Sequence, residues 1–205
     1  MRLLVKPILL SFILTNQSYA DTPHDSLVES LDGIKSIQSV FEQTTVDRNG
    51  EEINVSQGKL TVGLAGQFLI ETTSPFAQHL VSNGQDFYTY DPEIDQVIVR
   101  TLMQDVSQVP ILLLGNADQS FLADYEVSQQ SKHAEDVFTL KSKASSVFEQ
   151  LQLTFNHDAP TTIWLKDSLG QTTEIKLNQV VMNEKLDQSI FEFQVPEGVD
   201  LIDDR

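Results

Sequence analysis

The chain has 205 residues, of which 13 are basic and 30 are acidic, so its formal net charge is −17 at pH 7. It contains no cysteine, which excludes disulfide bonds, thiolate catalysis, cysteine-ligated metal sites and attachment of a lipid through cysteine. Because so negative a chain repels phosphate, nucleic acid and anionic lipid headgroups are disfavoured as partners, whereas a basic protein surface is favoured.

The first 20 residues are predicted to be a secretory signal peptide. Arg2 and Lys6 make the start basic, residues 8–14 form a short apolar run, and the segment ends in small residues at Ala20. A transmembrane anchor would need about 20 apolar residues, so it is the weaker alternative. We expect cleavage after Ala20 and one exported, soluble domain over residues 21–205.

Residues 26–40 are predicted to form an amphipathic helix that lies on a sheet. Ser26 or Asp25 can cap its start. A strand over residues 40–46 is expected to follow. The apolar residues of the helix recur at spacings of three and four and are Leu27, Leu31, Ile34, Ile37 and Phe41.

Residues 58–90 are predicted to form an antiparallel meander with one apolar face, because large apolar residues alternate with polar ones. Asn83 and Gly84 form the residue pair that favours a tight hairpin turn. A further strand is expected over residues 96–102. The alternating apolar residues of the first two strands are Leu60, Val62, Leu64, Phe68 and Ile70.

Two short apolar segments interrupt the strands. Residues 109–115 begin next to Pro110 and end at Gly115, which is typical of a short helix, and residues 118–125 can form a second one. These helices can serve as a lid over the sheet, or they can be ordinary buried helices that close one end of it. Periodicity alone favours neither interpretation.

The second half of the chain repeats the strand pattern. Together the two halves predict one curved antiparallel sheet of about ten or eleven strands, with two or three helices packed against it. The strands predicted in the second half cover residues 126–130, 137–141, 150–155, 161–166, 172–179 and 190–195.

The sequence contains no motif of a catalytic or metal site. It has no G-x-S-x-G elbow, no H-E-x-x-H pair and no glycine-rich phosphate loop. His133 near Glu135, and His157 beside Asp158, are better explained as solvated loop residues than as metal ligands. We therefore expect a non-enzymatic protein without cofactor or metal, whose function is to bind something apolar.

Several short motifs make the chain resemble the periplasmic outer-membrane lipoprotein carrier proteins of Gram-negative bacteria. The resemblance extends from the signal peptide to Asp200. The motifs are FEQ at 41–43, GKLTV at 58–62, QF at 67–68, DFYTYDP at 86–92, DQV at 95–97, Pro110, DSLGQT at 167–172 and FEFQVPEGVD at 191–200.

The resemblance implies an α+β, mainly β fold: an incomplete, strongly curved antiparallel β-barrel with a lid of about three helices. It implies a monomeric periplasmic chaperone that binds lipoproteins through their acyl chains. Its other partners would be an inner-membrane ATP-binding-cassette release complex and an outer-membrane lipoprotein receptor. The alternative is a half-barrel sensor or protein-interaction module that fills its own cavity and carries no lipid.

The resemblance and the apolar pattern together predict which side chains meet the acyl chains. We expect a Phe68→Glu substitution to abolish cargo binding and to leave the fold intact. The residues expected to line the cavity are Leu31, Ile34, Phe41, Leu60, Val62, Phe68, Ile70, Leu80, Tyr88, Tyr90 and Val97. The residues expected in the lid are Ile111, Leu112, Leu113 and Phe121.

One position departs from the family pattern. The resemblance implies a basic residue followed by proline in the turn after the 58–62 strand, where the basic side chain holds the lid shut by hydrogen bonds. This chain has Leu64 and Ala65 there. Because leucine donates no side-chain hydrogen bond, closure would depend on apolar contact or on another donor.

Overall fold

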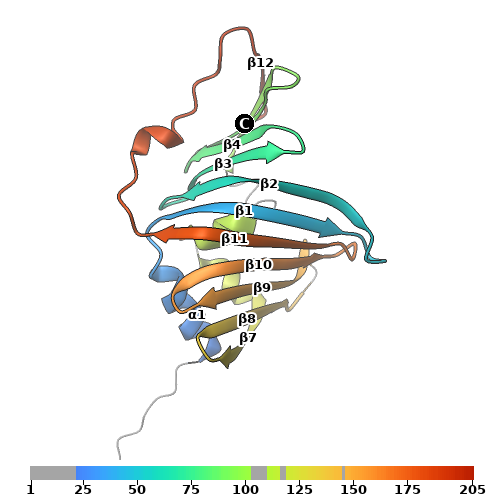
Figure 1. The fold of residues 1–205 in the computed structure, drawn as a ribbon, viewed down its shortest axis with the longest axis vertical. Helices are drawn as coiled ribbons and strands as arrows, with labels where there is room; N and C mark the ends of the chain where they lie inside the picture. The colour runs from blue at the N-terminus through green and yellow to red at the C-terminus, as the bar shows by residue number, and fades with distance from the viewer. Residues whose placement is uncertain (1–21, 103–109, 116–118, 145) are drawn as a thin grey trace, which may run out of the picture.

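The computed structural model describes residues 22–102, 110–115, 119–144 and 146–205. The predicted signal peptide, the start of the first lid helix at Val109 and the start of the second at Asp118 therefore lie outside the described residues. Twelve strands of the described chain form one sheet in the order β12-β6-β5-β4-β3-β2-β1-β11-β10-β9-β8-β7 (Figure 1). The sheet is open, because its edge strands, β12 and β7, do not pair with each other.

The strands follow one another along the chain with short turns between most of them, and all neighbours in the sheet are antiparallel except β12 and β6. Their bounds are β1 (Ile37–Val46), β2 (Glu52–Val62), β3 (Gln67–Ser74), β4 (Gln78–Asn83), β5 (Asp86–Asp91), β6 (Gln96–Thr101), β7 (Tyr125–Lys132), β8 (Glu135–Ser142), β9 (Phe148–Asn156), β10 (Ala159–Asp167), β11 (Thr172–Met182) and β12 (Asp200–Asp203).

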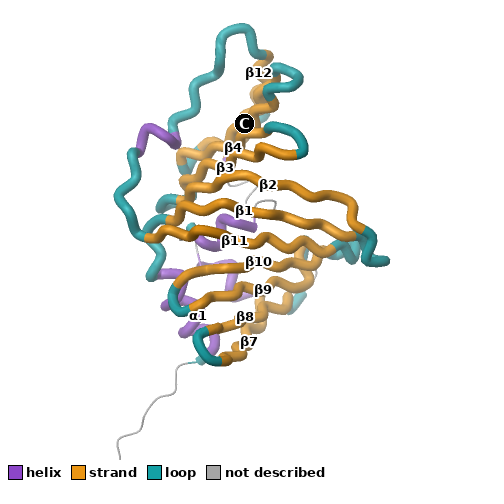
Figure 2. The backbone as a smooth tube through the Cα atoms, in the orientation of Figure 1, coloured by secondary structure: helices purple, strands orange, loops and turns teal. Residues whose placement is uncertain are grey.

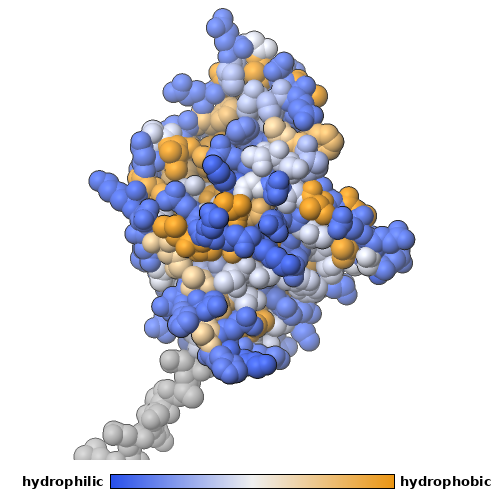
Figure 3. Space-filling view, in the orientation of Figure 1, coloured by the Kyte–Doolittle hydropathy of each residue, from blue (hydrophilic) through white to orange (hydrophobic). Residues whose placement is uncertain are grey.

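Helical segments cover one face of the sheet, which we call the inner face. Helix α1 (Pro23–Asp32) and the 3₁₀ segments η2 (Pro110–Leu114) and η3 (Gln119–Asp124) lie behind the strands in Figures 1 and 2. None of the described helices is both long and apolar enough to cross a membrane. The opposite, outer face is mostly hydrophilic with apolar patches between the polar side chains (Figure 3).

The hydrophobic core lies between the inner face and the helical segments. Alternate residues of each strand point into it, as Leu151, Leu153 and Phe155 of β9 do, and all three are buried. Leu27 and Leu31 of α1 reach the same core. The alternation of apolar and polar residues in the sequence therefore indicates which face of the sheet each residue occupies.

Helix α1 is shorter than the sequence pattern predicts. Its cap is Thr22, whose hydroxyl accepts a hydrogen bond from the Asp25 amide at 3.2 Å, and it ends at Asp32 before Gly33. Ile37, which continues the helical spacing, instead pairs with Val62 in the sheet. The helix prediction over 26–40 was wrong at its C-terminal end. The apolar spacing there fits both a helix and a strand, and the β-branched residues favour pairing in a strand.

The prediction of a mainly β, unclosed sheet is confirmed, but the number of elements differs. The described chain has twelve strands, one α-helix and three 3₁₀ segments, rather than about ten or eleven strands and three helices. Residues 190–195 do not form the predicted strand: η4 (Gln188–Phe191) precedes an irregular segment there. The final strand is β12, which the sequence analysis missed and which pairs in parallel with β6.

The C-terminal segment adds a small apolar layer on the outer face. Phe191 is fully buried, and η4 contacts β3 and β4. The Phe193 ring stacks on Tyr88 with centroids 5.2 Å apart and lies 5.9 Å from the Tyr90 centroid. Phe191 is thus buried and Phe193 half-buried by packing on an existing sheet, without a strand partner of their own.

We predict that Phe191→Leu lowers the free energy of unfolding by about 1 kcal/mol, because leucine leaves part of the ring's site empty. The ring lies so close to Gly63 that a Cβ at that glycine would be 3.0 Å from its Cζ atom. Urea unfolding measures the effect. The half-exposed Val195, changed to alanine, is the control and should cost under about 0.5 kcal/mol. An unchanged stability in Phe191→Leu would show that this layer does not stabilise the fold.

Exposed ion pairs join the end of the chain to the β5–β6–β12 edge. Arg205 contacts Asp86 at 3.0 Å and Asp203 at 2.6 Å, and Arg100 contacts Asp204 at 3.0 Å. The hydrogen bond from Arg205 lowers the pKa of Asp203 below its usual value. Because these groups are solvated, the pairs contribute little to stability and serve mainly to position β12.

Candidate functional site

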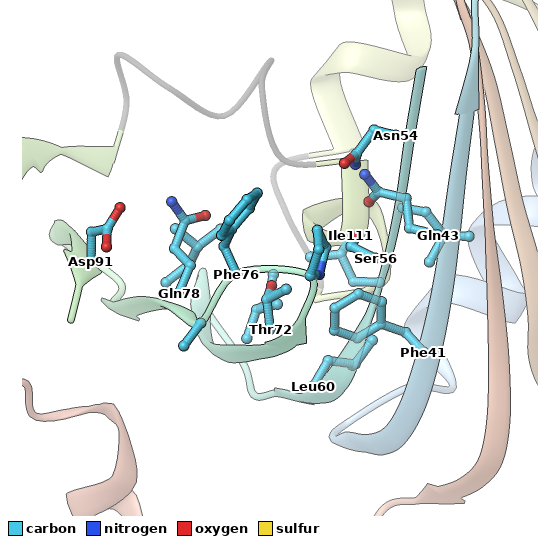
Figure 4. Close-up of a pocket in the computed structure, with 15 residues that line it drawn as sticks. Phe41, Gln43, Asn54, Ser56, Leu60, Thr72, Phe76, Gln78, Asp91 and Ile111 are labelled. Atoms are coloured by element: carbon cyan, nitrogen blue, oxygen red, sulfur yellow. The ribbon is translucent and has the colours of Figure 1, made fainter. Parts of the chain in front are cut away.

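A cavity of about 390 Å³ opens on the inner face, between strands β1–β5 and β11 and segment η2 (Figure 4). Its apolar wall comes from the sheet, and Ile111 of η2 covers it from the opposite side. Phe76, in the turn between β3 and β4, also lines it and is 66% exposed. The lining residues are Phe41, Gln43, Asn54, Ser56, Leu60, Ile70, Thr72, Pro75, Phe76, Ala77, Gln78, Leu80, Asp91, Ile111 and Ile175.

Strand register places the apolar wall. Leu60 pairs with Ile70, and Ile70 pairs with Leu80, so three large side chains of β2, β3 and β4 form one transverse row on the inner face. Phe41 stands on the next row, opposite Gly58. Residues directly opposite each other in a sheet share a face, so this row presents a continuous apolar surface to the cavity.

Gly58 leaves room for Phe41. A Cβ at Gly58 would be 2.9 Å from the Phe41 Cε1 atom and 2.1 Å from the carbonyl oxygen of Glu71. The absence of a side chain therefore allows β3 to approach β2 and allows the phenyl ring to lie across the glycine. This close packing gives a physical reason for the glycine in the GKLTV motif.

Segment η2 closes the cavity from the helical side. Ile111 is 3% exposed and Leu114 is fully buried in the core, while Leu113 is partly buried against it. The segment also contacts β10. The predicted lid residues Leu112 and Phe121 belong to η2 and η3, but their side chains lie outside the described part of the structure.

Four of the predicted lining residues lie deeper, in the packed core. Leu31, Ile34, Val62 and Phe68 are at most 1% exposed, and none of them lines the cavity. The Phe68 ring packs against Phe87 with centroids 5.6 Å apart. A glutamate at position 68 would bury an unpaired carboxylate in this core, so the expectation that Phe68→Glu leaves the fold intact does not agree with the structure.

Tyr88, Tyr90 and Val97 lie on the outer face and do not line the cavity. Tyr88 pairs with Val99 and Tyr90 with Val97, and both tyrosine rings pack against Phe193. Burial raises the pKa of Tyr88, and the nearby carboxylate of Asp86 raises it further. Of the eleven predicted lining residues, Phe41, Leu60, Ile70 and Leu80 are the four that the structure places on the cavity wall.

Leu64 lies in the turn between β2 and β3, where it is 42% exposed. The turn is closed by a hydrogen bond from the Gly63 amide to the Gln67 carbonyl at 2.8 Å, and Ala65 adopts a positive φ of 54°. Leu64 is absent from the cavity wall. The replacement of a lid latch at this position by apolar contact stays a prediction.

Sequence reasoning missed the polar part of the cavity. Gln43, Ser56, Thr72 and Gln78 stand at inner-face positions, where alternation alone assigns polar residues to the solvent side. The sequence signal that could have found them is their position: in the alternation of each strand, they stand at the same positions as the buried residues. Among the described lining residues, Asp91 is the only charged one.

The described residues include no group of three or more histidine, aspartate or glutamate side chains placed to hold a metal ion. Hydrogen bonds in surface turns lower the pKa of Asp47 and of Asp187, and neither residue lines the cavity. The described lining residues therefore form a binding cavity with an apolar wall and a polar margin in which Asp91 is the one charged residue.

Comparison with known proteins gives the family. Residues 32–194 match the family described as "Outer membrane lipoprotein carrier protein LolA". An outer-membrane lipoprotein carrier protein of Chromohalobacter salexigens is 34% identical over 179 residues, which cover 87% of this chain and 85% of that protein. Its counterpart in Legionella pneumophila strain Paris is 31% identical over 196 residues, covering 95% of this chain and 96% of that protein.

A solved structure is similar in fold. The crystal structure of a LolA superfamily protein from Nitrosomonas europaea superposes with a TM-score of 0.50 at 19% identity, covering 83% of this chain and 98% of that one. At that identity the likeness concerns the fold alone, whereas the sequence matches cover most of this chain. The chain therefore belongs to the outer membrane lipoprotein carrier protein LolA family.

Proposed function

We propose that the protein is a periplasmic chaperone that carries lipoproteins by burying their acyl chains in the inner-face cavity. It would receive them from an ATP-binding-cassette release complex in the inner membrane and deliver them to a lipoprotein receptor at the outer membrane. Cleavage of residues 1–20 would release it as a soluble monomer. Membership of the carrier family and the cavity together support this proposal.

The cavity is the observation that supports this function most directly. Its volume of about 390 Å³ is within the range of roughly 300–1,000 Å³ that is typical of ligand pockets. Exposing an acyl chain of about 16 carbons to water costs a free energy on the order of 12 kcal/mol, at about 0.8 kcal/mol for each methylene. Leu60, Ile70, Leu80 and Phe41 provide apolar surface that would offset this cost.

Segment η2 is the element that we propose to move when cargo enters. Ile111 occupies the cavity opposite the sheet, so an acyl chain would exchange the contacts of Ile111 for its own. Because one set of apolar contacts replaces another, the net free energy of binding would be moderate, and cargo could be released to a receptor. Ile111, Leu112, Leu113 and Phe121 would form this lid.

A release assay tests the proposal. Spheroplasts that synthesise an acylated lipoprotein are incubated with the purified protein, and the lipoprotein in the supernatant is measured. We expect release only when the protein is present. The matched control is the same cargo with its lipidated cysteine changed to serine, which should show no dependence on the protein. Absence of release, together with no extractable bound lipid, would favour the sensor or interaction module instead.

A further inference from the structure

Polar side chains line the cavity beside its apolar wall. Leu60, Ile70 and Leu80 form one transverse row of the inner face. The next row carries Thr72 paired with Gly58 and with Gln78. Two residues further along β1 and β2, Gln43 is paired with Ser56. Phe41 and Ile175 lie in these same two rows, so the amide and hydroxyl groups border the hydrocarbon wall at more than one place. We call these polar groups, together with Asn54 and Asp91, the polar mouth.

Side chains of the polar mouth are available for a ligand. Figure 4 shows Gln43 beside Asn54 at one end of the cavity, and Gln78 toward Asp91 at the other. Within the described part of the chain, the amide groups of Gln43, Asn54 and Gln78 form no side-chain hydrogen bond. Each amide can donate two hydrogen bonds and accept two, so the mouth can pair with uncharged carbonyl and N–H groups.

The mouth is unsuited to an anion. No lysine, arginine or histidine is among the described residues that line the cavity, and Asp91 contributes a carboxylate. The whole chain carries a net charge of −17. A negative headgroup would therefore lose water, meet a like charge and gain no cationic partner, all of which oppose binding.

We propose that the polar mouth selects acyl ligands by the charge of their headgroup: ligands whose headgroup has only uncharged ester or amide groups are accepted, and ligands whose headgroup carries a carboxylate or phosphate are rejected. The acylated cysteine of a lipoprotein carries its chains on ester and amide groups, whereas a fatty acid ends in a carboxylate and membrane phospholipids carry a phosphate. This inference rests on the proposed carrier function. It gives the carrier a way to leave the surrounding membrane lipids behind.

Two ligands with the same chain test the selection. Monopalmitoylglycerol and palmitate share a 16-carbon acyl group and differ in the headgroup, an ester in one and a carboxylate in the other. Each competes, below its critical micelle concentration and at pH 8, with a neutral fluorescent acylglycerol bound to the purified protein. We expect the ester to bind at least about tenfold more tightly, and palmitoyl lysophosphatidylglycerol to bind as weakly as palmitate.

A positive charge placed in the mouth should abolish most of the preference. Gln78→Lys is expected to raise palmitate affinity by about tenfold and to change monopalmitoylglycerol affinity by less than about twofold. The matched control is Gln57→Lys, which adds the same charge on the outer face of β2, where Gln57 is exposed. Asp91→Asn is a second, isosteric variant and should raise palmitate affinity by about fivefold.

The outcomes separate this inference from the proposed function. Headgroup selection would be overturned, and the carrier function left intact, by either of two results. One is equal affinity of the wild-type protein for both ligands; the other is an equal change of palmitate affinity in Gln78→Lys and Gln57→Lys. Failure of monopalmitoylglycerol and of palmitate to bind at all would overturn both. Tighter binding of the ester, with the expected response of palmitate to Gln78→Lys, would support both.

Discussion

Replacing Leu80 with glutamate is expected to lower the affinity for a palmitoyl ligand by at least about 30-fold, which corresponds to about 2 kcal/mol. Leu80 stands on the cavity wall beside Ile70, so the new carboxylate would contact the bound hydrocarbon. A carboxylate that loses water against an acyl chain has no compensating partner there. Fluorescence displacement of an acylglycerol measures the loss directly.

The same substitution should leave the fold intact, because Leu80 is only partly buried and an empty cavity admits water to the carboxylate. Val55→Glu is the matched control: Val55 lies on β2, a strand that also lines the cavity, but it is 47% exposed on the outer face. We expect its affinity to be unchanged. Normal binding by Leu80→Glu, in a protein with the circular dichroism of the wild type, would remove Leu80 from the site.

Gly58→Ala is expected to lower the free energy of unfolding by about 2 to 3 kcal/mol. Its Cβ would be 2.1 Å from the carbonyl oxygen of Glu71, a backbone atom that can move only if β2 and β3 separate. The same Cβ would push the Phe41 ring, 2.9 Å away, toward the cavity. Urea unfolding should therefore show the loss of stability, and the displacement assay should show weaker acyl binding.

Gly33→Ala is the control for this prediction. Gly33 ends helix α1 with an ordinary helical φ of −65°, and a Cβ there would be 3.4 Å from its nearest neighbour, a carbonyl oxygen. The substitution should change stability by no more than about 0.5 kcal/mol. Equal effects at the two glycines would mean that the close approach of β2 and β3 at Gly58 is not under steric constraint.

Alternation in the sequence predicted most strands because each strand buries one face against the same core. It misassigned β5, where Phe87 points inward while Tyr88 and Tyr90 point outward. Aromatic residues on both faces are explained only by the C-terminal segment, which brings Phe193 onto the outer face from about a hundred residues away. A contact between such distant residues leaves no trace in local periodicity.

The cavity itself was predicted in part. Apolar residues at inner-face positions marked its wall, and Phe41, Leu60, Ile70 and Leu80 do line it. Periodicity could not separate these residues from Val62 and Phe68, which occupy the same faces but are packed solid. The difference depends on how far the helical segments cover each row, and that is a property of the three-dimensional packing.

The polar mouth escaped prediction for the opposite reason. Gln43 and Gln78 interrupt the apolar phase of their strands, which in a sequence indicates a strand end or a solvated position. In the fold they border a cavity, so their inward-facing position identifies them as candidate ligand contacts. Polar residues in the inward phase of a strand are worth testing as ligand contacts wherever a sheet remains open.

Photocrosslinking with an acyl chain tests directly whether the inner-face cavity holds hydrocarbon. A palmitoylated lipopeptide with a diazirine near the end of the chain is bound to the protein, irradiated, and mapped by mass spectrometry. We predict that the crosslinks fall on inner-face residues of the wall and on η2, at Leu60, Ile70, Leu80 and Ile111. Crosslinks confined to the outer face, around Tyr88 and Phe193, would contradict the account.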